Sequence, residues 1–354
     1  MLDFSRNYSF ASIEDYRLSL ESGYLLDRFN GFIPYIRYIP TYVGPDPAFI
    51  GEIRKQPQVF MVEDQSTILP ALIQFDGQNF LIQPLGSFSS KLFDDRVDLV
   101  LVGNLQNAEK KVDLSDKIIV PLVSKGFNIY GHFLIDLMPR LKMYSAINNV
   151  SKFVGFIAEN APDWSIEMAS ACIRSLNGEL EFMKKDVAYL CNVYVPMPSR
   201  YHDYLAPCSV FGGDLLTQRN FITPSRKVYI SRSRWKNKSR DLMNREEVEK
   251  VFADGGFDIV SPEDLSFQDQ LKVFASAKIL AGEAGSGLHN VVFSNAFLTI
   301  NVNSSRQSHF IQAGLSRYTS SSSIYLYGES QDQGWNSPFT VDLDCAGELV
   351  GGLP

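Results

Sequence analysis

The chain has 354 residues, 45% of them hydrophobic and 21% charged, a composition typical of a globular protein with room for two domains. Asp and Glu number 40 against 33 Lys and Arg, and the net charge of -7 argues against a nucleic-acid partner, which needs a basic face. Met1 to Arg6 are mixed and polar, and no apolar run approaches the roughly 18 residues of a spanning helix. We therefore expect a cytoplasmic protein that meets a membrane, if at all, only peripherally at its inner face.

The first third of the chain alternates short β-branched and aromatic runs with Pro, Gly and Asp turns, which predicts a strand-rich segment over 1–118. Two of its strands are predicted at 35–39 and 97–102. Apolar runs then alternate with stretches of helical periodicity, as in an open α/β sheet. This alternation predicts strand 117–122, helix 130–148, strand 153–157, helix 166–177 and strand 193–195.

A segment rich in Pro and Gly over 201–224 is the best candidate for an interdomain connection. The alternation restarts after it and predicts strands at 227–230, 257–260, 278–281 and 297–302, helices at 244–253 and 266–276, a glycine-rich turn at 282–287 and a helix from Leu288 on. We therefore expect an α/β fold with two Rossmann-like domains facing a cleft. Their parts are a strand-rich segment over 1–118, α/β domains over 119–215 and 216–335, and a tail over 336–354.

The predicted helix at 130–148 carries an isolated polar stripe. His132, Asp136 and Arg140 are spaced four residues apart, so they share one face of a helix that is otherwise apolar. Buried charges need partners, so one interpretation is a structural ladder of these three side chains. The other is that the stripe lines a cleft where Asp136 or His132 accepts a proton from a substrate. Pro139 removes the backbone bond to Ile135 and should loosen the helix locally.

The strand at 227–230 runs directly into a basic loop that contains Arg232 and Arg234. The carboxyl ends of strands in an open α/β sheet are where such folds bind ligands, and a guanidinium can hold a diphosphate through two parallel hydrogen bonds. The alternative is a solvated basic turn, because Lys236, Lys238 and Arg240 follow.

The glycine-rich turn that follows the strand at 278–281 is the third candidate. A strand, a glycine turn and a helix start together point free backbone N–H groups at an anion. The candidate ligand-binding residues here are Glu283, Gly285, Ser286, Gly287, His289 and Asn290. Neither the GxGxxG spacing nor a P-loop is present, so a purely structural turn remains the alternative.

Metal and nucleophile motifs are weak in this sequence. The four Cys lie far apart without a CxxC pair, which predicts reduced, buried thiols and no structural zinc. The sequence has no GxSxG elbow and no HExxH helix. Asp342 and Asp344 form an Asp-x-Asp pair, but their late position favours a structural role, and we expect neither a bound metal nor a cofactor.

Taken in order, these segments resemble the catalytic region of family-61 glycosyltransferases, in particular bacterial capsular and exopolysaccharide-type members, over about 120–305. The residues that carry the resemblance are Gly131, His132, Asp136, Pro139 and Arg140; Tyr229, Ile230, Ser231 and Arg232; Arg240, Asn244, Glu247 and Val248; Phe257, Pro262, Glu263, Leu265, Ser266, Phe267 and Gln270; and Gly282, Gly285, Gly287, Leu288, Asn290 and Phe293. One position departs from the pattern, because many members have His where this chain has Ala284.

The resemblance implies a GT-B-like protein that inverts the anomeric carbon of a nucleotide sugar, with an acceptor-side domain at 119–215 and a donor domain at 216–335. The implied base is Asp136, acting directly or through His132, with Arg140 on the same stripe. Arg232, Arg234, Asn244 and the turn at 283–290 would bind the donor. The acceptor would be a glycan, free or lipid-linked, and no oligomeric state is predicted. The alternatives are a carbohydrate- or nucleotide-binding protein without activity, which Ala284 favours, and a nucleotide-sugar epimerase.

Overall fold

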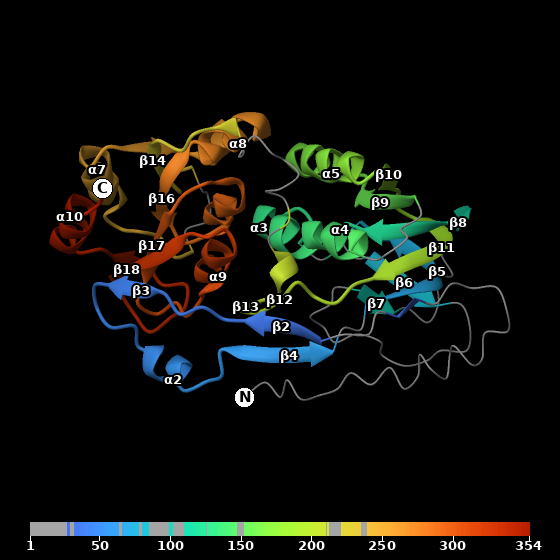
Figure 1. Cartoon of the computed structure of the whole chain (residues 1–354), viewed down its shortest axis with the longest axis horizontal. Coiled ribbons are helices and arrows are strands. Elements are labelled where there is room, and N and C mark those ends of the chain that lie inside the picture. Colours follow the sequence, from blue (N-terminus) through green and yellow to red (C-terminus); the bar gives the residue numbers. More distant parts are fainter. Residues whose placement is uncertain are drawn as a thin grey trace. The chain divides into compact units, whose positions relative to one another are not determined.

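The computed structural model describes residues 27–28, 32–63, 66–77, 80–84, 99–101, 110–124, 126–146, 152–209, 211, 221–234 and 239–354 (Figure 1). The chain forms two compact units. Unit 1 comprises Met1–Phe32 and Glu63–Pro198, and unit 2 comprises Ile33–Val62 and Ser199–Pro354. These units differ from the expected domains, because the change of unit falls at 198/199 rather than 215/216. Residues 33–62 were expected in the N-terminal segment, but they belong to unit 2, where β3 (Thr41–Val43) pairs with β18 (Ser322–Ser330).

Unit 1 is built on one mixed sheet with the strand order β10-β9-β8-β11-β5-β6-β7 and with β1 beside β5. The first four strands form parallel pairs, whereas β5 is antiparallel to both β11 and β6. The strands are β1 (Asp27–Arg28), β5 (Thr67–Phe75), β6 (Phe80–Pro84), β7 (Leu99–Leu101), β8 (Lys110–Pro121), β9 (Phe153–Ala158), β10 (Glu179–Met183) and β11 (Val187–Val195). Only the middle of the strand expected at 97–102 lies within the described residues.

Two helical segments connect the parallel strands of unit 1. The first comprises α3 (Tyr130–His132), a π-helical turn (Phe133–Leu137) and α4 (Met138–Ser145), and the second is α5 (Asp163–Ser175). α4 packs against β8 and α5, and α5 packs against β9 and β10. Every residue of β9 is buried, as expected for a strand covered on both faces.

Unit 2 contains a sheet with the order β15-β14-β16-β17-β18-β19, in which all neighbours are parallel except β18 and β19. Its strands are β14 (Arg226–Ile230), β15 (Phe257–Val260), β16 (Ala277–Glu283), β17 (Leu298–Ser304) and β19 (Phe339–Thr340). Its helices are α7 (Arg245–Asp254), α8 (Phe267–Ala275), α9 (Ile311–Tyr318), α10 (Leu343–Gly351) and a 3-10 helix (Ser286–Phe293), which begins two residues before the helix expected from Leu288. The mixed α/β class is therefore confirmed.

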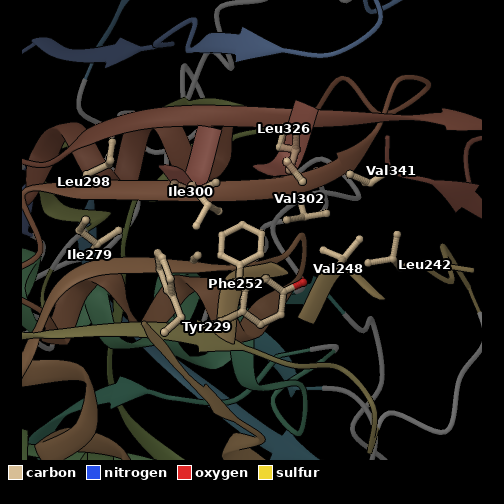
Figure 2. Packing of buried hydrophobic residues seen from close by; sticks show 14 of the residues in the cluster. Tyr229, Leu242, Val248, Phe252, Ile279, Leu298, Ile300, Val302, Leu326 and Val341 are labelled. Atoms are coloured by element: carbon tan, nitrogen blue, oxygen red, sulfur yellow. The ribbon is translucent and has the colours of Figure 1, made fainter. Parts of the chain in front are cut away.

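Helices cover both faces of this sheet, and the side chains of its central strand β17 point alternately to the two faces. Ile300 and Val302 belong to an apolar cluster with Phe252 of α7 and residues of α10 (Figure 2). Thr299 points to the opposite face, where its hydroxyl bonds to that of Ser316 in α9 at 2.7 Å. The residues expected to form a C-terminal tail therefore contribute β19 and α10 to the fold.

Residues 32–63 and 200–205 form a small four-stranded sheet in the order β12-β13-β2-β4, and 50–54 form the short helix α2 (Ile50–Arg54). The strands are β2 (Phe32–Ile36), β4 (Val59–Glu63), β12 (Arg200–Tyr201) and β13 (Tyr204–Leu205). Residues 201–209 of the expected interdomain connection thus belong to unit 2, and 212–220 lie outside the described residues. Within the described part of the chain, no helix is long and apolar enough to cross a membrane.

Candidate functional site

The topology of unit 2 places its first candidate site at the reversal of strand order. In chain order its parallel strands lie 2-1-3-4-5 across the sheet, so the chain changes direction between β14 and β16. Ligands in open α/β sheets bind outside the carboxyl ends of the strands at this switch point. Ile230 pairs with Gly282, so the loops after β14 and β16 begin side by side. Gly282 is required there, because a Cβ would lie 2.6 Å from the carbonyl oxygen of Ile230.

Arg232 lies across the glycine turn that follows β16. Its Nη1 donates to the carbonyl oxygen of Ala284 at 3.1 Å, and a Cβ at Gly285 would lie 3.7 Å from the Arg232 Cδ and Cζ. Burial, and after it the nearby charge of Arg240, lowers the pKa of Arg232. An arginine remains charged in spite of such shifts. The environment therefore holds a partly desolvated cation that an anion would stabilise.

Arg240 is a second arginine of this site. Its backbone N–H donates to the Asn336 carbonyl at 2.9 Å, in a stretch where 239–244 runs beside 336–341. Its backbone is left-handed, at φ 58°. Burial lowers the Arg240 pKa, and its buried Nε has no hydrogen-bond partner among the described residues. Arg240 was part of the family resemblance but not of the predicted site, because only the pairing with 336–341 brings it to this edge.

A buried ion pair between Glu283 and Arg245 supports the glycine turn that follows β16. The Glu283 side chain is only 1% exposed, and its carboxylate accepts from Arg245 Nε at 2.7 Å, from Arg245 Nη2 at 3.0 Å and from the Arg232 amide at 3.3 Å. Arg245 Nη2 also donates to Asp241 Oδ1 at 2.7 Å, and the hydrogen bond to Glu283 raises the pKa of Arg245. Glu283 was expected to bind the ligand, but its burial fits a positioning role. Arg245 was not predicted, because its partner lies 38 residues away.

Two further predicted residues, His289 and Asn290, also bind the protein itself. Gln312 joins His289 to the turn, donating to the Gly285 carbonyl and lying 2.6 Å from His289 Nδ1. Asn290 is buried and donates to the Gly287 carbonyl at 2.9 Å. Such side-chain bonds to a carbonyl three residues back compete with α-helical bonding, which is consistent with the 3-10 form of this segment.

The remaining predicted residues of unit 2 lie in the glycine turn, in a backbone pairing with Val341 and on the surface. Ser286 and Gly287 begin the 3-10 helix, and a Cβ at Gly287 would crowd Ile230 at 3.0 Å. Asn244 is a structural residue that pairs with the Val341 backbone through both its amide nitrogen and its oxygen. Arg234 forms a solvent-exposed ion pair with Asp264, which is a kind of pair that contributes little stability. Lys236 and Lys238 lie outside the described residues.

In unit 1, His132 and Asp136 form a close pair. His132 Nδ1 lies 2.7 Å from Asp136 Oδ2, and the two side chains are 46% and 27% exposed. When Nδ1 carries the proton that Asp136 accepts, Nε2 is left as a free proton acceptor. Arg140 is buried, and its Nη1 donates to the carbonyls of Pro121 and Val123 at 2.8 and 3.3 Å. The expected substrate-binding role of Arg140 therefore does not fit its burial, whereas the other two residues reach the surface.

The backbone around this pair has the irregularity expected from Pro139. Residues Phe133–Leu137 form a π-helical turn, and the Met138 N–H donates to the Phe133 carbonyl five residues back. Pro139 lacks the N–H that would bind Ile135 in an α-helix, and the wider turn accommodates its ring. Such π-bulges are frequent at functional sites. Gly126, at φ 95°, approaches the same pair, since a Cβ there would lie 3.4 Å from the His132 ring.

The described residues contain no group of three or more His, Cys, Asp or Glu arranged to hold a metal ion. Asp342, from the Asp-x-Asp pair, caps α10 by accepting from the Cys345 amide at 2.9 Å, which is the structural role expected for it. Metal independence stays a prediction.

One comparison with known proteins found a match to a protein family. A model of the Glycosyltransferase 61 family matches residues 130–300, from the start of α3 into β17. This match confirms the resemblance to family 61 and supports a transferase of the glycosyl type, whereas the bacterial capsular and exopolysaccharide subtype stays a prediction. It includes both the His132–Asp136 pair and the arginine pair of unit 2. No curated protein sequence matches the chain significantly.

Proposed function

We propose that this chain, which matches the family-61 glycosyltransferases over 130–300, is an inverting and metal-independent member of the bacterial polysaccharide type. It moves a sugar from a nucleotide-sugar donor to a hydroxyl of a glycan acceptor, free or lipid-linked, in the cytoplasm. The observation that carries the proposal is the pair of partly desolvated arginines at the switch point of unit 2. We also propose a GT-B-like organisation, with the donor on unit 2 and the acceptor on unit 1.

Donor binding follows from the charges of unit 2. Burial lowers the pKa of both Arg232 and Arg240. Their like charges also destabilise each other in the absence of a ligand. A diphosphate relieves both effects, because each guanidinium gains a charge-assisted hydrogen bond to a phosphate oxygen. The buried Glu283–Arg245 pair fixes the loop that carries Arg232. The same contacts strengthen as negative charge develops on the departing diphosphate, so they contribute to catalysis.

Proton transfer is assigned to unit 1. Asp136 holds His132 through Nδ1, and His132 Nε2 takes the proton of the acceptor hydroxyl as its oxygen bonds to the anomeric carbon. The bond between that carbon and the phosphate oxygen breaks in the same step, and the nucleoside diphosphate leaves with the electron pair. A single displacement of this kind inverts the anomeric configuration. Asp136 is the direct base in the alternative assignment.

The test is release of nucleoside diphosphate from a panel of nucleotide sugars, with and without glycan acceptors. Purified wild-type protein should turn over at least one donor, and Arg232→Ala should lose most of this turnover while retaining its melting temperature. Arg234→Ala is the matched control, because Arg234 lies in the same loop but is paired on the surface. Tight binding of a donor without turnover would refute the enzyme and support a binding protein instead.

A further inference from the structure

The carboxyl edge of the unit 2 sheet carries a second group of side chains that the proposed chemistry does not use. His309 follows β17, and Trp335 follows β18, so both lie at the edge where β14 and β16 end. Their rings meet edge to face, with centroids 4.9 Å apart and planes at 89°. Both remain accessible, at 45% exposure for the His309 side chain and 38% for Trp335. An exposed tryptophan at a ligand-binding edge offers a stacking surface for a planar ring.

Hydrogen bonds hold the His309 ring and the backbone of both residues. Asp203, which is buried, accepts from His309 Nδ1 at 3.0 Å, and the Tyr325 hydroxyl donates to the His309 carbonyl at 3.2 Å. With Nδ1 bound to Asp203, the Nε2 of His309 is the ring nitrogen left for a ligand. On the Trp335 side, Gln307 donates to the Trp335 carbonyl at 3.3 Å. The His309 ring is therefore held by Asp203, and the Trp335 ring packs against it.

The loop that carries Trp335 is also ordered from within. Asp332 accepts from the Gly334 amide and the Ser337 hydroxyl, and these two hydrogen bonds lower the Asp332 pKa. Preorganised loops bind with a smaller loss of conformational entropy. A loop ordered in this way, with a tryptophan at its tip, is consistent with a recognition element.

This ring pair is next to the arginine pair. Asn336, the residue after Trp335, accepts from the Arg240 amide at 2.9 Å through its carbonyl and from the Ser239 hydroxyl at 3.1 Å through its side chain. Arg240 in turn lies close enough to Arg232 to lower its pKa. These bonds join the loop that carries Trp335 to the segment that carries Arg240, which makes a ligand with an anionic part and a planar ring the candidate for both pairs. A nucleoside diphosphate has these two parts, joined by a ribose.

We propose that Trp335 and His309 form the nucleobase subsite of the donor, with the base stacked on the Trp335 indole and an edge of the base bonded to His309 Nε2. Asp203 is a positioning residue that holds the His309 ring. This inference rests on the proposed function, because it takes the diphosphate at Arg232 and Arg240 as the anchor of the same ligand. It adds base selectivity to that function, which the arginines alone do not provide.

The experiment compares the affinities of uridine diphosphate, guanosine diphosphate and inorganic pyrophosphate for wild-type protein and for Trp335→Ala, Trp335→Phe and Arg232→Ala, by titration calorimetry. Stacking on an aromatic ring changes affinity by roughly tenfold or more per base, so wild type should bind at least one nucleoside diphosphate that much more tightly than pyrophosphate. Trp335→Ala should remove this preference without changing pyrophosphate affinity, and Trp335→Phe should retain most of it. Arg232→Ala should weaken both ligands.

The outcomes separate this inference from the proposed function. If wild-type protein binds pyrophosphate and both nucleoside diphosphates equally, or Trp335→Ala retains the preference, the base subsite is refuted while the diphosphate site stands. If Trp335→Ala weakens only a nucleotide sugar and not the nucleoside diphosphate, Trp335 contacts the sugar and the inference is again wrong. If wild-type protein binds none of these ligands, the proposed function fails as well. His309→Gln, whose side-chain oxygen can still accept a hydrogen bond, should change which base is preferred more than it changes pyrophosphate affinity.

Discussion

Replacing Arg240 by Met should stabilise the free protein while weakening donor binding. In the free protein the Arg240 Nε is buried without a hydrogen-bond partner among the described residues, and its charge opposes that of Arg232. A buried donor without a partner costs about 1–3 kcal/mol, and Met removes it while keeping most of the aliphatic volume. The backbone strain of the left-handed conformation at this position is the same for both residues, so it does not affect the comparison. The free energy of unfolding should therefore rise by about 1 kcal/mol.

The same change should lower the affinity for a nucleoside diphosphate. A charge-assisted hydrogen bond contributes about 1.5–3 kcal/mol, which corresponds to a loss of roughly ten- to hundredfold in affinity. Chemical denaturation measures the stability, and titration calorimetry measures the affinity, on one preparation. Arg234→Met is the control, because its exposed pair with Asp264 predicts little change in either quantity. An Arg240→Met variant that is less stable than wild type and binds the diphosphate normally would refute the reasoning, since Arg240 would then be a structural residue.

Three further predictions concern the rest of the site. Asp136→Asn should lower turnover by about 10²–10⁴ through loss of the proton acceptor that orients His132, with nucleoside diphosphate affinity unchanged; a destabilised variant with normal turnover at low temperature would show a structural role instead. Glu283→Gln should destabilise the protein by about 3–5 kcal/mol, because it leaves Arg245 short of its buried partner, and a melting temperature equal to that of wild type would contradict this. Turnover should persist in EDTA; its complete loss, with recovery on addition of manganese or magnesium, would contradict the metal-independent mechanism.

Much of the fold follows from local sequence patterns. Four strands of the unit 2 sheet, β14 to β17, were predicted because their apolar residues recur with the period of a strand, as in Leu298, Ile300 and Val302, whereas β18 and β19 were not predicted. The helices at 244–253 and 266–276 were predicted within about one residue at each end, since each begins after a polar residue and ends near Gly255 or Ser276. The loosened turn at Pro139 also followed from local chemistry, because a missing N–H acts within one helical turn.

The candidate site was less predictable because its contacts are made between distant segments. Glu283 was expected to bind a ligand, but Arg245 from α7 occupies its carboxylate. Asn244 was given a ligand role, but its side chain completes a pairing with Val341, which lies 97 residues away. The same long-range pairing brings Arg240 beside Trp335. No periodicity or spacing in the sequence predicts these partners, because they depend on how loops meet at the edge of a sheet.

The measurement that tests the central claim most directly is NMR of the anomeric proton during turnover of a nucleotide sugar in the presence of a glycan acceptor. The account predicts that the donor signal decays as nucleoside diphosphate forms, and that the transferred sugar first appears with the opposite anomeric configuration. Transfer with retained configuration would contradict a single displacement by the acceptor hydroxyl with His132 and Asp136 as its base. Failure of the wild-type protein to consume any donor in the panel would contradict the assignment as a glycosyltransferase.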